Sequence, residues 1–441
     1  MNYREAIQYV RRIQKGDAVK PGLGMTKRLM EYLGNPQDKL DFVHVAGTNG
    51  KGSTAAFISS IYAAHGLKVG RYVSPAVFSE FEKIQYVYGG ESVYVTEEEM
   101  AEHITHIRCA IEKMQKRGEG VPTEFEIETA AAFLAFASWN CDLVVLEAGM
   151  GGRLDATNIV TTVQCAVITP VSMDHMKFLG STIEEIAYEK AGIIKRRIPV
   201  VVCQHDERAQ SCLARVCREQ ECKWRAVSGD DWKVRKASLL GTAFDYKRYR
   251  ELCIRMPGLY QVENACLAIE CVEAMNSRFP VSEEQLRKGL AQAVWRGRFD
   301  VYEKRPVVVM DGAHNPDGIQ HFLESVHAYF ENYRKVGIVG IFADKDYADM
   351  ARRIGDTFDQ VYTVTPPTGR GLPAEKLAEQ IRGHAVACTS IQEAVDLGGK
   401  KCEKLAGGGE EQGLFIFGSL SILKSAAEWL GLNELGRMGN K

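Results

Sequence analysis

The sequence predicts an α/β fold in which a large domain with a mostly parallel sheet is followed by a smaller, doubly wound α/β domain. Buried-strand patterns alternate with helical patterns in two series, one from residue 41 to 203 and one from residue 306 to 421. Glycine-containing loops follow most of these strands. Strands that alternate with helices form mostly parallel sheets that are covered by helices on both faces.

The first series supplies the large domain. Between its strands, "STAAFISSIYAAHG" predicts a helix that ends at Gly66. A second helix, "STIEEIAYEKAG", opens with the capping box of Thr182 and Glu185 and ends near Gly192. The strand patterns lie at 41–47 (DFVHVAG), 141–152 (CDLVVLEAGMGG), 164–172 (QCAVITPVS) and 198–203 (IPVVVC).

The second series supplies the smaller domain, with strand patterns at 306–318, 335–346, 359–367 and 413–421. The stretch 205–255 before it is highly charged and less regular, with short possible strands. We place the domain boundary near Gly297 to Asp300, which divides the chain into domains 1–297 and 298–441. The second series lacks a GxGxxG motif, so we expect no dinucleotide site there.

The composition is that of an ordinary globular protein, with 441 residues, 45% of them hydrophobic and 25% charged. A formal net charge of -2 gives no sign of a nucleic-acid or anionic-membrane partner. No apolar run approaches the ~18 residues of a membrane span, and the 12 cysteines form no CxxC pair. We therefore expect a cytoplasmic protein with reduced thiols that binds neither nucleic acid nor membrane.

The stretch "HVAGTNGKGSTAA" (44–56) reads as a phosphate-binding loop between a strand and a helix. Backbone N–H groups of such a loop and the helix N-terminus hold phosphate oxygens, and glycines let the chain approach closely. Lys51 would reach the β- and γ-phosphates, and Ser53 or Thr54 would hold phosphate or Mg²⁺. Gly52 separates this lysine from the serine, unlike the common GxxxxGK[ST] pattern. A plain glycine turn is the alternative, which the flanking strand and helix disfavour.

Possible metal ligands follow other predicted strands or lie near them. Glu147 ends "DLVVLE", His175 follows "AVITPVSMD", and Glu126 lies in "TEFEIETAAAF". Open α/β sheets bind ligands at the carboxyl ends of their strands. Spacing alone leaves a metal site and solvated surface residues as open alternatives.

Several motifs occur in an order that resembles the folylpolyglutamate synthase and dihydrofolate synthase family, within the Mur-ligase-like ATP-dependent amide ligases. The resemblance spans about residues 20 to 425. The motifs are "HVAGTNGKGS", "TEFEIETAAAF", "EAGMGGRLDATN", "DHMKFLGSTIEEIAYEKAGI", "PGLYQVENA", "WRGRFD" and "DGAHNPDG".

The resemblance implies a large P-loop nucleotide-binding domain and a Rossmann-like C-terminal ligase domain. It also implies an enzyme of folate and one-carbon metabolism that uses ATP and Mg²⁺. Such an enzyme adds L-glutamate to a folate, and in some members to dihydropteroate, through an acyl phosphate. We expect a monomer.

Site roles follow from the same resemblance. Thr48, Asn49, Gly50, Lys51, Gly52 and Ser53 would cradle the phosphates, and Asn264, Arg298 and Asp311 would bind the rest of ATP. One Mg²⁺ is expected on Ser74 and Glu147 and a second near His175. Lys190 matches a lysine that the family carries as a carbamate, although its position alone suits a solvated lysine in the last turn of a helix. His314 would orient glutamate or phosphate.

The folate end of the substrate would meet two segments, in which Asp155 would accept two hydrogen bonds from the pterin. These segments contain Thr123, Glu124, Phe125 and Glu126, and Leu154, Asp155 and Ala156.

The chain departs from the family pattern at Ala76, where histidine is common, and at Lys83, which replaces an arginine. These departures bear on the substrate loop more than on Ser74. Two other functions remain as alternatives. One is a related ligase acting on a peptidoglycan precursor, which the "LDATN" and "DHMKFLG" motifs disfavour. The other is a non-catalytic nucleotide-binding switch, which would not need Lys51, Glu147 and His175 together.

Overall fold

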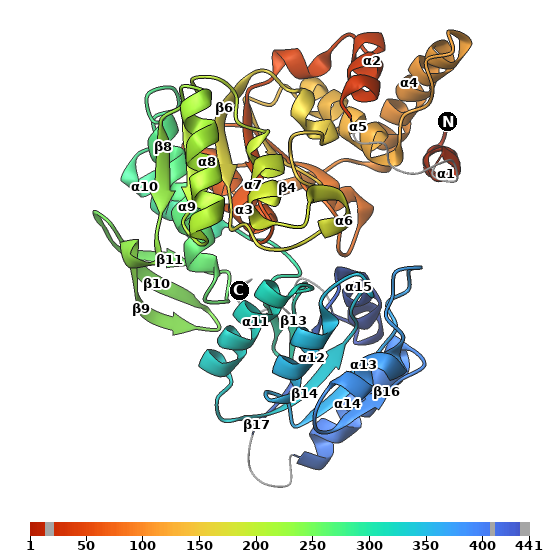
Figure 1. The fold of residues 1–441 in the computed structure, drawn as a ribbon, viewed down its shortest axis with the longest axis vertical. Helices are drawn as coiled ribbons and strands as arrows, with labels where there is room; N and C mark the ends of the chain where they lie inside the picture. Colours follow the sequence, from red (N-terminus) through yellow and green to blue (C-terminus); the bar gives the residue numbers. More distant parts are fainter. Residues whose placement is uncertain (14–21, 406–410, 433–441) are drawn as a thin grey trace. The chain divides into compact units, whose positions relative to one another are not determined.

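The computed structural model describes residues 1–13, 22–405 and 411–432, which form two compact units (Figure 1). The first unit comprises Met1–Trp232 and Glu263–Ala293, and the second comprises Lys233–Val262 and Val294–Lys441. The chain therefore passes between the units three times. The boundary predicted at residue 297 lies close to the last passage, whereas residues 233–262 group with the second unit instead of the first.

An eight-stranded sheet forms the centre of the first unit, in the order β4-β3-β2-β5-β1-β6-β7-β8. The six strands from β2 to β8 in this order run parallel, and β3 and β4 pair antiparallel at one edge. The strands are β1 (Phe42–Ala46), β2 (Val69–Tyr72), β3 (Ile84–Tyr88), β4 (Glu91–Tyr94), β5 (Leu143–Glu147), β6 (Val163–Ile168), β7 (Val200–Cys203) and β8 (Trp224–Val227).

Helices cover both faces of this sheet, because its central strands carry apolar side chains on both sides. On one face, α1 (Tyr3–Ile13), α2 (Gly24–Tyr32), α4 (Glu97–Lys116) and α5 (Glu124–Ser138) share one apolar cluster with β1 and β5. The same face carries a second cluster built from α7 (Ile183–Ala191) and α8 (Glu207–Glu219) over β6 and β7. The unit also contains α3 (Lys51–His65), α6 (Met176–Leu179), α9 (Gln261–Met275, which begins at the unit boundary) and α10 (Glu283–Gln292).

Two predicted helices form as the sequence indicated. Helix α3 ends at His65 with Gly66 as its C-cap, although it starts at Lys51, two residues before the predicted pattern. Helix α7 opens with the capping box of Thr182 and Glu185 and ends at Ala191, with Gly192 as its C-cap. Because α3 begins at Lys51, the phosphate-loop lysine is itself the first helical residue.

The second unit holds a six-stranded sheet in the order β12-β13-β17-β14-β15-β16, parallel except for the edge strand β12. Its strands are β12 (Asp300–Tyr302), β13 (Val307–Met310), β14 (Tyr333–Val339), β15 (Gln360–Thr363), β16 (Ala385–Ala387) and β17 (Glu411–Phe417). Its helices are α11 (Pro316–Tyr329), α12 (Tyr347–Gly355), α13 (Ala374–Gln380), α14 (Ile391–Leu405) and α15 (Leu420–Trp429).

The core of the second unit lies under α11, α12 and α13, which pack on side chains of β13 and β17. Helix α14 lies on the opposite face, where Gly398 approaches Leu414 and Ile338. The irregular stretch before the boundary forms a three-stranded sheet from β9 (Trp232–Ser238), β10 (Gly241–Tyr246) and β11 (Tyr249–Ile254). The predicted α/β class with two mostly parallel sheets is thus confirmed. Among the described residues, no helix has both the length and the apolar run that a membrane span requires.

Candidate active site

Four adjacent parallel strands bring the predicted site residues of the first unit to one edge of the sheet. The strands β2, β5, β1 and β6 are neighbours, so their carboxyl ends lie side by side. Ser74 follows β2, Glu147 ends β5, the glycine loop follows β1, and His175 lies in the segment after β6. The strand ends of an open α/β sheet are where such folds bind ligands.

The glycine loop between β1 and α3 is held closely on two sides. A Cβ atom on Gly47 would lie 2.9 Å from Thr169 Cβ and closer still to Thr169 Oγ1. A Cβ atom on Gly50, whose φ is +85°, would lie 3.2 Å from Asn264 Cγ and closer to its Oδ1. Only glycine fits such close approach at positive φ. The backbone N–H of Thr48 donates to Pro170 O at 2.8 Å, which ties the loop to the segment after β6.

The first turn of α3 offers an anion site and a buried hydroxyl. Its leading N–H groups and its dipole favour phosphate oxygens. Ser53 is 1% exposed, and its Oγ has no hydrogen-bond partner among the described residues. A buried hydroxyl without a partner is destabilising unless a ligand or ion satisfies it. The residues present therefore fit a phosphate with its Mg²⁺.

Two lysines converge on the carbonyl of Gly47. Lys51 Nζ donates to Gly47 O at 3.3 Å and to Thr48 O at 3.2 Å, and it lies 3.9 Å from Glu147 Oε1. Lys190 Nζ, carried by α7, donates to the same Gly47 O at 2.7 Å. Lys190 is 3% exposed. The alternative that it is a solvated lysine at a helix end is therefore wrong.

Burial and, next, the neighbouring Lys51 ammonium lower the pKa of Lys190 to about 7, while Asp174 acts in the opposite direction. Near neutral pH the side chain is thus partly the uncharged amine. An uncharged amine is the form that reacts with CO₂ to give a carbamate, so the local electrostatics suit the modification that the resemblance implies.

Asp174 is a site residue that the sequence analysis missed. It is buried, acts on Lys190, and accepts from the backbone N–H of His175 at 2.8 Å. His175 has a left-handed backbone (φ 50°) at the start of α6, and its Nε2 lies 4.0 Å from Asp174 Oδ2. The sequence did carry a signal for Asp174, because an acidic residue directly precedes the predicted ligand His175.

Asn264 lies against the phosphate loop itself. It is buried, and its Oδ1 accepts from Thr54 Oγ1 at 3.5 Å beside the close approach of Gly50. The structure thus gives Asn264 a contact with the loop and with the first turn of α3. Its predicted contact with adenine stays a prediction.

Residues 74–83, which contain the two departures from the family pattern, are held by carboxylates of the same segment and of α5. The Ser74–Pro75 peptide is cis. Glu82 Oε2 accepts from Val77 N at 3.0 Å and from Phe78 N at 3.2 Å. Lys83 pairs with Glu80 and Glu128, each at 2.7 Å. Lys83 is therefore anchored to α5, close to the segment predicted to meet the substrate.

The substrate segment 123–126 opens helix α5. Thr123 and Glu126 form its capping box, and Glu126 Oε1 also accepts from Thr26 Oγ1 at 2.8 Å. Both Glu126 oxygens accept hydrogen bonds that hold the fold, which favours a structural role, and its assignment as a metal ligand stays a prediction. Phe125 packs against Gly149, where a Cβ atom would lie 2.5 Å from Cζ of the ring. Glu124 is half-buried, and burial, followed by Glu128, raises its pKa.

The second substrate segment surrounds Asp155, which is buried between Ala156 and the half-buried Leu154. Asp155 Oδ2 accepts from Met150 N at 2.8 Å, and Oδ1 accepts from Thr157 N at 3.1 Å and from Thr157 Oγ1 at 2.5 Å. Both oxygens are thus engaged within the chain. A pterin could take the two predicted hydrogen bonds only by displacing some of these donors.

Two of the residues predicted in the second unit, Asp311 and His314, follow β13, whereas Arg298 precedes β12. Asp311 is 2% exposed, and its carboxylate accepts from Tyr260 Oη and Phe299 N, both at 2.7 Å, and from Ala313 N at 2.6 Å. Burial raises the pKa of Asp311, and Arg298 opposes that shift. His314 Nδ1 lies 2.8 Å from Gly312 O. Tyr260, in the "PGLYQVENA" motif, was not singled out from the sequence.

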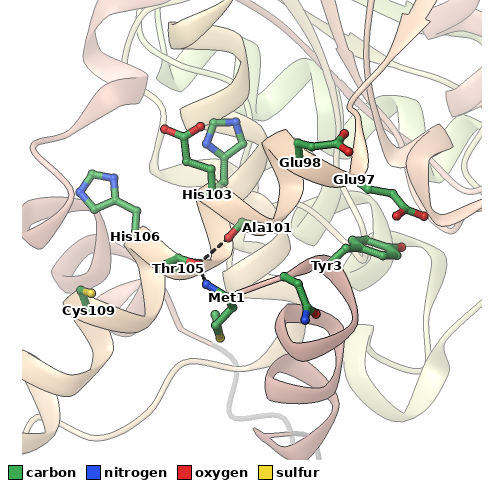
Figure 2. A pocket seen from close by; sticks show the side chains of 11 residues that line it. Met1, Tyr3, Glu97, Glu98, Ala101, His103, Thr105, His106 and Cys109 are labelled. Carbon is green, nitrogen blue, oxygen red and sulfur yellow. Dashed lines mark hydrogen bonds between the residues drawn. The ribbon is translucent and has the colours of Figure 1, made fainter.

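A separate cleft of about 690 Å³ lies between α1 and α4 (Figure 2). Its wall carries three glutamates, and His103 and His106 extend from the same helix. None of the predicted site residues lines it. The cleft is therefore distinct from the strand-edge site.

Comparisons with known proteins agree with the geometry. Residues 45–272 match the Mur ligase middle domain, and residues 297–406 match the Mur ligase glutamate ligase domain. A dihydrofolate synthase/folylpolyglutamate synthase of Bacillus subtilis (strain 168) is 37% identical over 344 residues, which cover 76% of this chain and 79% of that protein.

Two solved structures are similar over almost the whole chain. A Mycobacterium tuberculosis folylpolyglutamate synthase complexed with ADP has a TM-score of 0.89 at 27% identity, covering 98% of this chain and 99% of that one. An FPGS–AMPPCP–folate complex has a TM-score of 0.83 at 31% identity, covering 98% of this chain and 100% of that one.

Proposed function

The chain belongs to the folylpolyglutamate and dihydrofolate synthase family of Mur-type ligases, and from this we propose how its residues join glutamate to a folate. It is an ATP-dependent acid–amino-acid ligase. L-glutamate supplies the amine, and Mg²⁺ is the metal. The enzyme works as a monomer in the cytoplasm. Dihydropteroate is a second acceptor within the proposal.

The observation that best supports this assignment is that Lys51 and Lys190 both donate to one carbonyl, beside Glu147 and a buried Ser53 hydroxyl that has no partner among the described residues. A carboxylate is a poor electrophile. Moving the γ-phosphoryl group of ATP onto its oxygen releases ADP and gives an acyl phosphate. The glutamate amine then attacks the acyl carbon, the amide bond forms, and phosphate and a proton leave.

In this proposal the residues at the strand edge bind, neutralise or orient the reacting groups. The loop amides and the first turn of α3 bind the phosphates and align them. Lys51 neutralises charge that spreads over the phosphoryl oxygens during transfer. Asp174 orients His175 through its backbone N–H. Lys190 lies within hydrogen-bond reach of the loop carbonyl, where an added carboxylate would face the same space.

Ser53, Ser74, Glu147 and a carbamylated Lys190 offer oxygen ligands of the type that Mg²⁺ prefers, and His175 would complete the set. Bound there, Mg²⁺ supplies positive charge that stabilises the transferring phosphoryl group.

The decisive test is product mass. The purified enzyme is mixed with ATP, Mg²⁺ and L-glutamate, and with either a reduced folate, dihydropteroate or a peptidoglycan precursor. We expect one glutamyl residue added per ADP formed with the folate, and none with the peptidoglycan precursor. ADP release that ignores the acceptor would point to the nucleotide switch, and product from the third arm would point to the alternative ligase. The dihydropteroate arm decides whether the enzyme has both folate activities.

A further inference from the structure

We propose that His44 and Thr157 are positioning residues, which form a hydrogen-bonded relay from the middle of β1 to the carboxylate of Asp155. Through Asp155 this relay holds the loop that follows Glu147. His44 lies in the "HVAGTNGKGS" motif and Thr157 in "EAGMGGRLDATN", and neither has a role in the reaction described above.

The direction of each hydrogen bond follows from the number of protons available. Thr157 Oγ1 lies 2.5 Å from Asp155 Oδ1 and 3.0 Å from His44 Nε2. A threonine hydroxyl has one proton, and a carboxylate only accepts, so Thr157 donates to Asp155. Thr157 Oγ1 must then accept from the ring, which places the proton of His44 on Nε2. The relay runs from His44 through Thr157 to Asp155.

The ring of His44 is neutral in this arrangement. Complete burial, followed by the nearby Lys195 ammonium, lowers its pKa to about 3. With the proton on Nε2, the other nitrogen, Nδ1, is an acceptor, and it has no hydrogen-bond partner among the described residues. A buried nitrogen without a partner is destabilising, because its hydration is lost and nothing replaces it.

A leucine would avoid that cost at a position whose strand neighbours on the same face, Phe42 and Ala46, are both apolar and packed in the core. Packing alone therefore does not account for histidine at residue 44. Its single donated hydrogen bond, to Thr157, is the contribution that a leucine could not make.

Asp155 connects the relay to the strand-edge site. It accepts from Met150 N and caps the short helix Ala156–Ile159, so it closes the loop of residues 148–155. That loop starts directly after Glu147. Strand β1 leads into Gly47 three residues after His44. The relay thus fixes the Glu147 loop relative to the strand that carries the phosphate loop, across 113 positions of sequence.

The relay predicts a specific pattern of activities among variants of His44 and Thr157. These activities are measured in the ligase reaction, so this test rests on the proposed function. Thr157→Val removes the hydroxyl and keeps the shape, and we expect kcat to fall about 10-fold, as for other residues that orient a site through a neighbour. Binding of Mg²⁺–AMPPCP, measured by calorimetry, should change much less. Thr157→Ser and His44→Gln, which keep the hydroxyl and an N–H donor, should retain most of the activity that Thr157→Val and His44→Leu lose.

The double variant His44→Leu/Thr157→Val separates a relay from two independent packing defects. If both residues act through one chain of hydrogen bonds, the double variant is no slower than the slower single variant. Losses that multiply would overturn the proposal, as would equal losses in Thr157→Ser and Thr157→Val.

Nitrogen-15 NMR of the histidine rings tests the relay without any substrate, with His44→Gln used to assign the signal. The His44 ring should be neutral with its proton on Nε2 from pH 5 to 8, and the proton distribution should change in Thr157→Val. A proton on Nδ1 in the wild-type protein would overturn the relay. An inactive wild-type enzyme with the expected NMR signature would contradict the proposed function and leave the relay supported.

Discussion

Replacement of Gly47 by alanine tests the geometry of the phosphate loop most directly. Gly47 has a φ of +153° and lies where β1 meets the segment after β6. Its missing side chain leaves room for Thr169, since a Cβ atom would lie 2.9 Å from Thr169 Cβ and 3.0 Å from Thr169 O, and nearer still to Oγ1. The backbone oxygen cannot rotate away, so the two segments must separate.

The size of the effect follows from two terms. Overpacking of a buried contact costs about 1–3 kcal/mol. A positive φ at a residue with a Cβ atom adds about 1–2 kcal/mol. Together they predict a loss of about 2–5 kcal/mol from a total stability on the order of 5–15 kcal/mol. We therefore expect the Gly47→Ala protein to fold, with a clearly lower Tm.

Catalysis should suffer more than stability, because the carbonyl of Gly47 accepts hydrogen bonds from both Lys51 and Lys190. A shift of about 1 Å in groups that position a reacting phosphate lowers kcat on the order of 10²-fold. The assay is ADP release coupled to glutamyl addition at saturating substrates, alongside Tm.

Gly66→Ala is the matched control. Gly66 follows the other end of the same helix with a φ of +105°, but a Cβ atom there meets nothing within 4 Å. The Gly66→Ala protein should lose only the stability that a positive φ costs a residue with a Cβ atom, about 1–2 kcal/mol, and should keep its turnover. Equal Tm values and equal turnover in the two variants would refute the close packing of the loop against Thr169.

Three other predictions concern single side chains. Lys51→Ala should fold normally and lose kcat on the order of 10²-fold or more, because Lys51 faces developing phosphoryl charge; near-normal turnover would remove Lys51 from the phosphate site. Lys190 should carry a carbamate, so activity should fall after CO₂ is removed and return with bicarbonate; an unmodified mass for Lys190 in the active, Mg²⁺-loaded enzyme would contradict this. The pKa of His44 is about 3 when folded and 6.5 otherwise, so the unfolded chain binds more protons between these values and stability falls as pH drops below 6.5. Between pH 6.5 and 5 this loss is about 2 kcal/mol; His44→Gln should therefore lose less Tm than the wild type over this range, and parallel Tm curves would argue against a buried neutral ring.

The sequence predicted what local patterns control. Strands β1, β5, β6 and β7, the ends of α3 and α7, and the phosphate loop were all expected from hydrophobic alternation, caps and glycines. Asp174 and Tyr260 were missed because their roles depend on contacts with Lys190 and Asp311, which the chain brings together only by folding. Residues 233–262 pack with the second compact unit, which no local pattern indicated, although the match to the Mur ligase middle domain runs through them to residue 272.

Lys190 shows why local patterns fall short at this site. A lysine in the last turn of a helix is normally solvated and favoured by the helix dipole. Here α7 packs on the sheet so that the side chain enters the strand edge, where an ammonium beside Lys51 is electrostatically unfavourable. The fold stabilises that arrangement only partly, through Asp174 and the carbonyl of Gly47.

The carboxylates in and near the motifs differ in whether a neighbouring ammonium group faces them. Glu126, Asp155 and Asp311 accept hydrogen bonds from neighbouring N–H and O–H groups of the chain, and these bonds hold loops and helix starts in place. Glu147 lies 3.9 Å from Lys51 Nζ, and Asp174 acts on Lys190. Asp174 also accepts a hydrogen bond, from the backbone N–H of His175, so the facing ammonium and not the absence of hydrogen bonds separates the two groups. A carboxylate that faces a cation is in a place where charge changes during catalysis. The chemistry of the first unit is therefore expected at Glu147 and Asp174. Glu126 and Asp155 hold segments of that unit in place, and Asp311 does the same within the second unit.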